Sequence, residues 1–183
     1  MRLMSRGVHD CPEPERVEQV AKADVEIAVA GAKGRGVFAA REFVRGETVI
    51  VGKAIGCPPG RTRMSVQVDW ERHVEMDAPA TLLNHSCAPN LGARENQWCA
   101  YDFVAVRDIF AGQELVFDYA MTEHELVAPL SCCCGSVACV GEIRPWSDRD
   151  QEWREQNAVW VARYLRVSSP PVVAQRLKRL TQR

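Results

Sequence analysis

A cluster of cysteines near residue 132 constrains this chain more than any other feature does. Cys132, Cys134 and Cys139 form a C-x-C-x4-C pattern, with Cys133 in the intervening position. In a non-secreted chain, clustered cysteines more often bind a metal ion than form disulfides. Three thiolates are one fewer than a closed structural zinc site requires, so a fourth ligand must come from another segment. Free buried thiols are the alternative, but three consecutive cysteines beside a glycine make a poor core.

The segment at residues 84–90, with the sequence NHSCAPN, offers the fourth ligand in Cys87. It combines two amides, an imidazole, a hydroxyl and a thiol directly after Leu82 and Leu83. Such a polar run is costly to bury unless its groups make specific bonds. An ordinary Asn/Ser/Pro-rich turn around a core cysteine is the alternative. A shared zinc ion would close a long loop and couple metal binding to folding.

Composition narrows the class of protein. The 183 residues are 46% hydrophobic and 26% charged, which is typical of one globular domain with an extension. A net charge of −1 lacks the basic surplus of a nucleic-acid binder, so no direct nucleic-acid binding is expected. No apolar run reaches the ~18 residues of a membrane span, and the N-terminus lacks a signal-peptide core. An intracellular location, cytoplasmic or nuclear, is the resulting expectation.

Short alternating runs between glycine- and proline-containing turns predict a mainly β domain. The run at residues 98–106 is the longest strand candidate, and residues 115–119 are expected to be its neighbour in the sheet. Further strands are expected at residues 25–29, 37–39, 48–51 and 64–68.

The C-terminal part of the sequence changes to helical periodicity. One helix is predicted at residues 151–165, with Trp153, Trp160, Val161 and Tyr164 on one stripe, and a second at residues 172–180. A short helix is also expected at residues 14–23. The C-terminal helices are expected to pack on the β domain, and a homodimer contact through them is the alternative. The expected divisions are 1–23, 24–125, 126–146 and 147–183: an N-terminal extension, a β domain, a zinc segment and a helical C-terminal extension.

Four motifs, taken in order, resemble the SET-domain protein-lysine methyltransferases. The first is the K-G-x-G turn of residues 33–36, and the second is NHSCAPN at residues 84–90. The third is GQELVFDY at residues 112–119, and the fourth is the cysteine pattern, which matches the family's post-SET zinc motif. Their order and spacing match from about residue 25 to residue 141. A lone G-x-G or Asp-Tyr pair would be weak evidence for this resemblance, whereas four motifs in the family's order are specific evidence.

The resemblance implies a fold, a cofactor and a metal. The fold would be the mainly β SET-domain (β-clip) fold, made of small sheets with a knot-like C-terminal threading. S-adenosylmethionine would contact the glycine turn and the Asn-His pair, and Ile143 or Trp146 would lie against its adenine. Zinc would be held by Cys87 together with the three later cysteines. The residues implied for cofactor binding are Lys33, Gly34, Arg35, Gly36, Asn84, His85 and Ile143.

The resemblance also implies a reaction, which is methyl transfer to the ε-amine of a lysine in a protein substrate. Tyr119 is the expected catalytic residue, because a phenol hydroxyl can orient the neutral amine without itself reacting. Phe117 occupies the family's Phe/Tyr switch position and predicts a channel wide enough for di- or trimethylation. Tyr101 is a second channel candidate. For both tyrosines the alternative is ordinary strand packing.

The chain departs from the family pattern in two places that bear on substrate. No cysteine-rich pre-SET region precedes residue 24, and the insert at about residues 60–80 is short. In the family that insert forms one wall of the substrate groove, so long-peptide recognition is in doubt. A free amino acid or small-molecule amine is therefore an alternative acceptor. A SET-shaped interaction module without turnover is the alternative from a different class.

Overall fold

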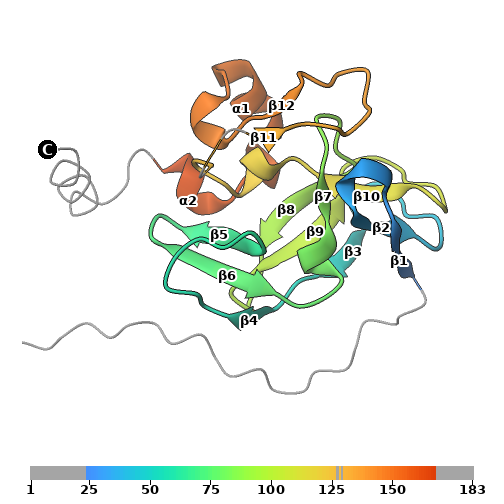
Figure 1. Ribbon diagram of the computed structural model, residues 1–183, viewed down its shortest axis with the longest axis horizontal. Coiled ribbons are helices and arrows are strands. Elements are labelled where there is room, and N and C mark those ends of the chain that lie inside the picture. Colours follow the sequence, from blue (N-terminus) through green and yellow to red (C-terminus); the bar gives the residue numbers. More distant parts are fainter. Residues whose placement is uncertain (1–23, 127, 129, 168–183) are drawn as a thin grey trace, which may run out of the picture.

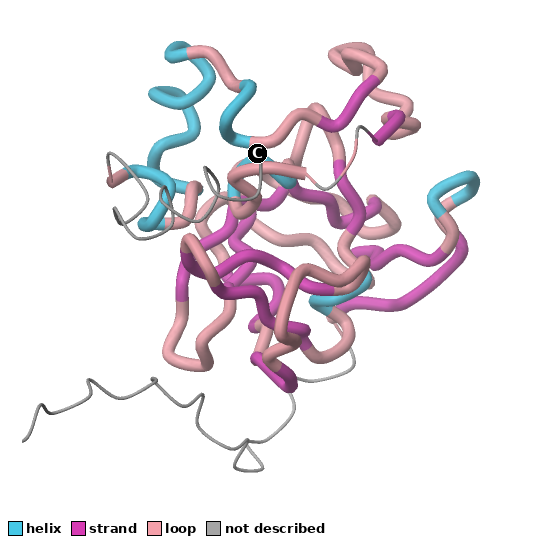
Figure 2. The backbone as a smooth tube through the Cα atoms, turned by 60° about the vertical axis from the view of Figure 1, so that its left-hand side comes forward, coloured by secondary structure: helices cyan, strands magenta, loops and turns pink. Residues whose placement is uncertain are grey.

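The computed structural model describes residues 24–126, 128 and 130–167. Strands fill the middle of the molecule, and the helical segments after residue 145 lie together at one edge of them (Figures 1 and 2). This arrangement is the mainly β architecture that the alternating runs predict. The helices expected at residues 14–23 and 172–180 lie outside the described residues. One of the two C-terminal segments expected to form the alternative homodimer contact is therefore not described.

The principal sheet joins strands that are far apart in the sequence. Its strand order is β1-β2-β10-β8-β9-β3. β7, which precedes β8 in the sequence, lies off this path and pairs with β10 in parallel. The β2–β10, β8–β9 and β3–β9 pairs are antiparallel, whereas β10 and β8 are parallel. The strands are β1 (Val25–Val29), β2 (Arg35–Ala39), β3 (Thr48–Val51), β7 (Asn84–His85), β8 (Leu91–Glu95), β9 (Tyr101–Ala105) and β10 (Glu114–Phe117).

Two smaller sheets complete the β structure. The insert before residue 84 forms an antiparallel sheet of β4 (Ala54–Gly56), β6 (Arg72–Met76) and β5 (Ser65–Asp69), in that order. After the principal sheet, β11 (Leu130–Ser131) pairs with β12 (Glu142–Ile143) on either side of the later cysteines.

The helical segments are short. Single 3-10 turns are η1 (Gly31–Lys33), η2 (Ala80–Leu82), η3 (Tyr119–Met121) and η4 (Trp146–Asp148). The C-terminal part comprises α1 (Gln151–Asn157), η5 (Ala158–Trp160) and α2 (Arg163–Arg166). In the described part of the chain, no helix has the length and apolar character needed to cross a membrane.

The prediction of one continuous helix at residues 151–165 is wrong. The chain leaves the helix after η5, where the Ala162 N–H donates to the Met121 carbonyl instead of continuing the helical ladder. Trp160 lies on β8 at Gly92, where an added Cβ atom would come within 2.5 Å of the indole. Docking of this segment on the sheet therefore overrides its helical periodicity.

The predicted pairing of residues 98–106 with 115–119 is also wrong. The first strand begins only at Tyr101, and β8 lies between it and β10. Asn90 lies just before β8 and is buried. Its side-chain amide forms hydrogen bonds with backbone groups of β10, as the backbone of a neighbouring strand would. Its side chain donates to the Glu114 carbonyl and accepts from the Val116 N–H, at 2.8 and 2.9 Å. The last residue of the NHSCAPN motif therefore attaches the motif to β10.

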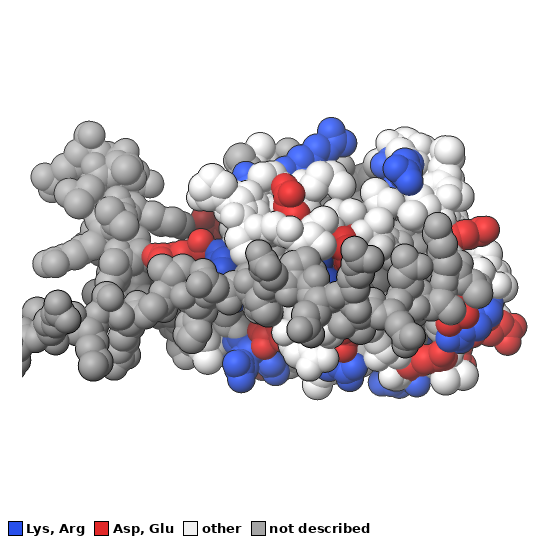
Figure 3. Space-filling model, turned by 90° about the horizontal axis from the view of Figure 1, so that it is seen from below, with Lys and Arg blue, Asp and Glu red and all other residues white. Residues whose placement is uncertain are grey.

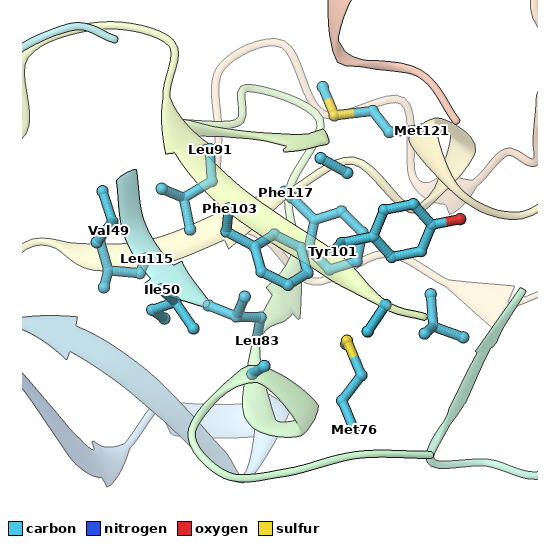
Figure 4. Packing of buried hydrophobic residues seen from close by; sticks show 14 of the residues in the cluster. Val49, Ile50, Met76, Leu83, Leu91, Tyr101, Phe103, Leu115, Phe117 and Met121 are labelled. Carbon is cyan, nitrogen blue, oxygen red and sulfur yellow. The ribbon is translucent and has the colours of Figure 1, made fainter. Parts of the chain in front are cut away.

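The core lies between the principal sheet and the insert. Val37 and Leu115 face each other across β2 and β10, and both are fully buried. Phe103 and Phe117 have ring centroids 5.0 Å apart, and Figure 4 shows them beside Tyr101 and Leu83. On the face seen in Figure 3, basic and acidic side chains are interspersed among the visible atoms, in keeping with the net charge of −1.

Candidate functional site

The four cysteines chosen from the sequence meet at one point. The sulfur atoms of Cys87, Cys132, Cys134 and Cys139 all lie within 4.8 Å of one another, and the Cys87 and Cys132 sulfurs are 3.8 Å apart. A tetrahedral zinc site with Zn–S distances near 2.3 Å has sulfur–sulfur distances of about 3.8 Å. The donor set and its spacing therefore fit a structural zinc ion. Cys133 is exposed and lies outside this group.

The thiols of the cluster differ in how readily they lose a proton, and burial raises the pKa of Cys132. Burial raises the pKa of Cys87. At Cys134 burial acts in the same direction, but backbone N–H donors from Cys87 and Ser136 outweigh it and lower the pKa to about 6. A bound dication stabilises neighbouring thiolates strongly. An ion bound between the four sulfurs would therefore hold them all in the deprotonated form.

His85 links the cysteine cluster to Tyr119. Its Nδ1 accepts from the Tyr119 N–H at 3.3 Å, and its Nε2 lies 3.5 Å from the Cys87 sulfur. Burial, followed by the charges of Arg149 and Lys33, lowers the pKa of His85 to about 4. The imidazole is therefore neutral near pH 7, and because Nδ1 accepts, the proton resides on Nε2 and points toward sulfur.

Tyr119 lies on the wall of a cavity of about 430 Å³. Its hydroxyl donates to the Leu83 carbonyl at 3.2 Å, and its ring packs against Phe117 with centroids 5.0 Å apart. Burial, followed by the charge of Glu123, raises the pKa of Tyr119 to about 12. The phenol therefore stays protonated at any physiological pH. The cavity is otherwise lined by the insert, by Phe117 and by residues that follow η3.

The glycine turn and Asn84 come together around Glu114. The Asn84 amide donates to the Arg35 carbonyl at 3.0 Å and to Glu114 Oε1 at 2.9 Å, and Lys33 pairs with Glu114 Oε2. Gly34 is exposed, with φ of +84° in the region that glycine favours. The two predicted cofactor-binding segments, the glycine turn and the one that carries Asn84, are thus joined through one carboxylate.

Gly36 is the position where the site tolerates no side chain. A Cβ atom there would lie 2.8 Å from Glu114 Oε1 and 2.9 Å from Asn84 Nδ2. The Gly36 backbone therefore packs directly against Asn84 and Glu114, and this packing fixes the turn beside the Asn84 amide. The residues present are compatible with the cofactor implied by the sequence.

We expect Gly36→Ala to weaken S-adenosylmethionine binding by at least about tenfold, because overpacking of about 1–3 kcal/mol must move the Asn84 amide or the turn. Calorimetry with S-adenosylmethionine measures the change. Gly60→Ala is the matched control, since a Cβ at Gly60 meets nothing within 4 Å. Equal affinities for the two variants would contradict the assignment of this turn to cofactor binding.

Asp118 fixes the turn that presents Tyr119. It is fully buried, and its side chain accepts from the Ala120 N–H at 3.0 Å as the N-cap of η3. Arg149 Nη2 contacts both carboxylate oxygens of Asp118, at 2.8 and 2.7 Å. The guanidinium of Arg149 also stacks over Trp153 in α1, 4.6 Å from the ring centroid. The C-terminal extension therefore supports the site directly.

The remaining predicted residues fall in different places. Phe117 lines the cavity. Tyr101 does not: it is completely buried, and its hydroxyl donates to the Gln67 carbonyl at 2.6 Å, so it is a core residue. Ile143 lies in β12 opposite Leu130, which borders the cavity. Trp146 opens η4 and stacks on Arg154.

Sequence reasoning missed four charged residues that contact the site. Glu114 stands in the GQELVFDY motif, which signals the site but not this residue's role. Glu123 is a buried acid four residues after Tyr119, and burial raises its pKa. Arg61 and Arg149 pair with Glu123 and Asp118, respectively. No local pattern distinguishes these two arginines from the many others in the chain.

Comparison with known proteins points to one family. The model of the SET domain matches residues 34–120. Methyltransferase flvH of Aspergillus flavus is 34% identical over 94 residues, covering 50% of this chain and 51% of flvH. Histone-lysine N-methyltransferase 2B of Homo sapiens is 30% identical over 146 residues, covering 67% of this chain and 5% of the human protein. The chain thus spans about half of the first relative and a small part of the second.

Solved structures give the same fold. A crystal structure of KRYPTONITE in complex with mCHG DNA and SAH has a TM-score of 0.55 and 22% identity, covering 67% of this chain and 29% of that one. A second KRYPTONITE complex, with mCHH DNA, H3(1-15) peptide and SAH, has a TM-score of 0.52 and 23% identity, covering 66% and 29%.

Proposed function

This chain is a SET-domain protein, and we propose that it transfers methyl groups from S-adenosylmethionine to the ε-amine of a lysine in a protein substrate. The observation that carries the proposal is the placement of Tyr119. Its protonated hydroxyl lies on a cavity wall and is anchored to the Leu83 carbonyl, next to the segment that carries Asn84 and His85. Relatives named as histone-lysine methyltransferases support a lysine acceptor.

The chain's own residues would hold the cofactor and the metal in separate places. Gly34, Gly36 and the Asn84 amide would hold S-adenosylmethionine, which when bound supplies an electrophilic methyl group. The four clustered cysteines would hold zinc, whose role is structural because all four ligand positions are protein sulfurs. Lys33, Arg35, His85 and Ile143 remain proposed cofactor contacts.

Tyr119 would act by orientation rather than by proton transfer. An amine must be neutral to act as a nucleophile, and an apolar cavity disfavours the charged form of an amine. Holding reacting atoms in a near-attack arrangement can supply ~7–11 kcal/mol of the barrier. The Tyr119 hydroxyl and the Leu83 carbonyl together offer a polar point on an otherwise largely apolar wall. Phe117 in this wall supports room for more than one methyl group on the amine.

A small amine is the second candidate acceptor, and the cavity itself favours it. A volume of about 430 Å³ falls within the ~300–1,000 Å³ typical of small-molecule sites. The β4-β6-β5 insert is built from strands of only 3, 5 and 5 residues, so the wall that it can offer to a peptide is short. A free amino acid would fit this description as well as a protein lysine does.

The test is incubation of the full chain with S-adenosylmethionine labelled in its methyl group, together with histones, a cell extract and a mixture of free amino acids. Label in the protein fraction supports the first acceptor, and label confined to the low-mass fraction supports the second. If no fraction is labelled while calorimetry detects cofactor binding, the proposed methyl transfer fails.

The rate of transfer should rise with pH without a fall caused by Tyr119. A lysine amine with an ordinary pKa near 10.4 loses its proton through the range of pH 7–10, and the rate should follow the neutral fraction. Because the pKa of Tyr119 is raised to about 12, its hydroxyl remains a donor throughout that range. Initial rates in matched buffers test this. A descending limb below pH 10 that disappears in Tyr119→Phe would contradict it.

A further inference from the structure

The cavity beside Tyr119 has a cationic side as well as apolar walls. Arg61 and Arg63, from the segment before β5, line it together with apolar side chains such as Val66, Met76 and Leu83. Glu123 is the only acidic residue among the described lining residues. Cations are an unexpected lining for a site that receives an amine, because they repel its protonated form.

The Glu123 carboxylate is already engaged. Its Oε1 accepts from the Gln67 N–H at 2.8 Å and from the Thr122 hydroxyl at 3.4 Å. Its Oε2 lies 3.2 Å from Arg61 Nη2 and 3.8 Å from His73 Nε2. These contacts balance one positive charge within the wall and leave that of Arg63 without a described partner.

The same contacts hold Arg61 in one orientation. Its Nε donates to His73 at 3.0 Å, and its Nη2 donates to Gln67 Oε1 at 3.2 Å in addition to the Glu123 pair. A guanidinium has five N–H donors, and no described residue accepts from the two on Nη1. Its side chain is 20% exposed, so part of this fixed group remains accessible. Arg63 is exposed and adds a second guanidinium to the same lining, and it forms no ion pair with any residue of the described ranges.

We propose that the acceptor carries a carboxylate near its reacting amine, and that Arg61 and Arg63 bind this carboxylate while the amine points toward Tyr119. The inference rests on the proposed methyl transfer and names the substrate class of that site. Arginine suits the role because its fork matches a carboxylate geometrically.

The arrangement also serves the chemistry. A carboxylate paired with the arginines offsets their repulsion of an incoming ammonium group. Once the substrate is bound, the apolar walls favour loss of the amine's proton. Two sources could supply the carboxylate: the α-carboxylate of a free amino acid, or an acidic side chain flanking a lysine in a peptide.

The experiment compares acceptors that differ only in the anionic group. L-lysine is compared with L-lysinamide and cadaverine, and a peptide with glutamates flanking its lysine is compared with one carrying glutamines. Turnover is measured as kcat/KM with labelled cofactor on the full chain. Binding is measured separately by ligand-observed NMR with the product S-adenosylhomocysteine present. Arg63→Gln is the test variant, and Arg107→Gln, at an exposed position outside the cavity, is the control.

We expect the carboxylate-bearing member of the productive pair to be preferred by about tenfold or more, as for the loss of one charge-assisted hydrogen bond. Arg63→Gln should reduce this preference, and Arg107→Gln should not. The productive pair identifies the source of the carboxylate. Equal binding and turnover of acid and amide in both pairs would overturn the inference. Carboxylate-dependent binding that Arg63→Gln abolishes, without any turnover, would uphold it and instead refute the proposed methyl transfer.

Discussion

Tyr119→Phe is expected to lower kcat for methyl transfer by about 100-fold or more while leaving S-adenosylmethionine affinity within about twofold. Removing one preorganised donor from a reacting centre costs roughly 10²–10³ in rate. The variant removes only the hydroxyl that bonds the Leu83 carbonyl, and the ring contacts with Phe117 and His85 can persist. Single-turnover rates with labelled cofactor, together with calorimetric binding, separate the two quantities.

Tyr101→Phe is the matched control, because it removes a hydroxyl of equal size from a site outside the cavity. Loss of its bond to the Gln67 carbonyl should cost about 1–3 kcal/mol of stability, since that carbonyl is then left unsatisfied. Its kcat should change little. If Tyr101→Phe slowed the transfer as much as Tyr119→Phe does, the hydroxyl of Tyr119 would have no special role, and the sequence-based placement of Tyr101 in the channel would regain support.

The sequence was sufficient to predict the parts of the site that consist of a residue type at a definite spacing. Cysteine is chemically distinctive, so the pattern of three and the separate Cys87 pointed to one ion, and their sulfurs do converge. Gly36 and Asn84 were placed together by motif resemblance, and the structure brings the glycine backbone against the amide. In both cases the motif encodes a contact that few other residue types can make.

Long-range pairing could not be predicted in the same way. β8 has three consecutive buried residues, Leu91, Gly92 and Ala93, so it lacks the alternation that marks a half-buried strand. Missing β8 made β10 look like the neighbour of β9. The break between η5 and α2 depends on Trp160 reaching Gly92, a contact between segments far apart in the sequence.

The buried ion pairs could not be predicted from the sequence either. Arg149 and Asp118 are 31 residues apart, and neither has a local partner pattern. The Arg61–Glu123 pair joins the insert to the segment after η3 within the cavity wall. The specific substrate chemistry proposed for this chain depends on such pairs rather than on the shared motifs. Resemblance to the family therefore predicts the type of reaction but not the substrate.

Loss of zinc is expected to have the largest effect on the folded state. We expect one zinc ion per chain, and we expect Cys134→Ser or a strong chelator to lower the apparent Tm by at least about 10 °C. Structural zinc binding is worth about 10–16 kcal/mol in small domains, and about 2–4 °C of Tm corresponds to each kcal/mol at this chain length. Elemental analysis and thermal unfolding under reducing conditions measure both quantities.

Cys133→Ser is the matched control, because it replaces a neighbouring cysteine that is not a proposed zinc ligand. Cys133 lies between two of the proposed ligands but is exposed and outside the sulfur cluster, so its substitution should leave zinc content and Tm unchanged. Cofactor affinity should fall with zinc loss, because Cys87 follows Asn84 and His85 on one short segment and His85 joins it to Tyr119. Full stability of the zinc-free protein would contradict the zinc assignment, and so would equal effects of the two serine variants. Either result would also remove the evidence that the cysteines are physically linked to the cavity.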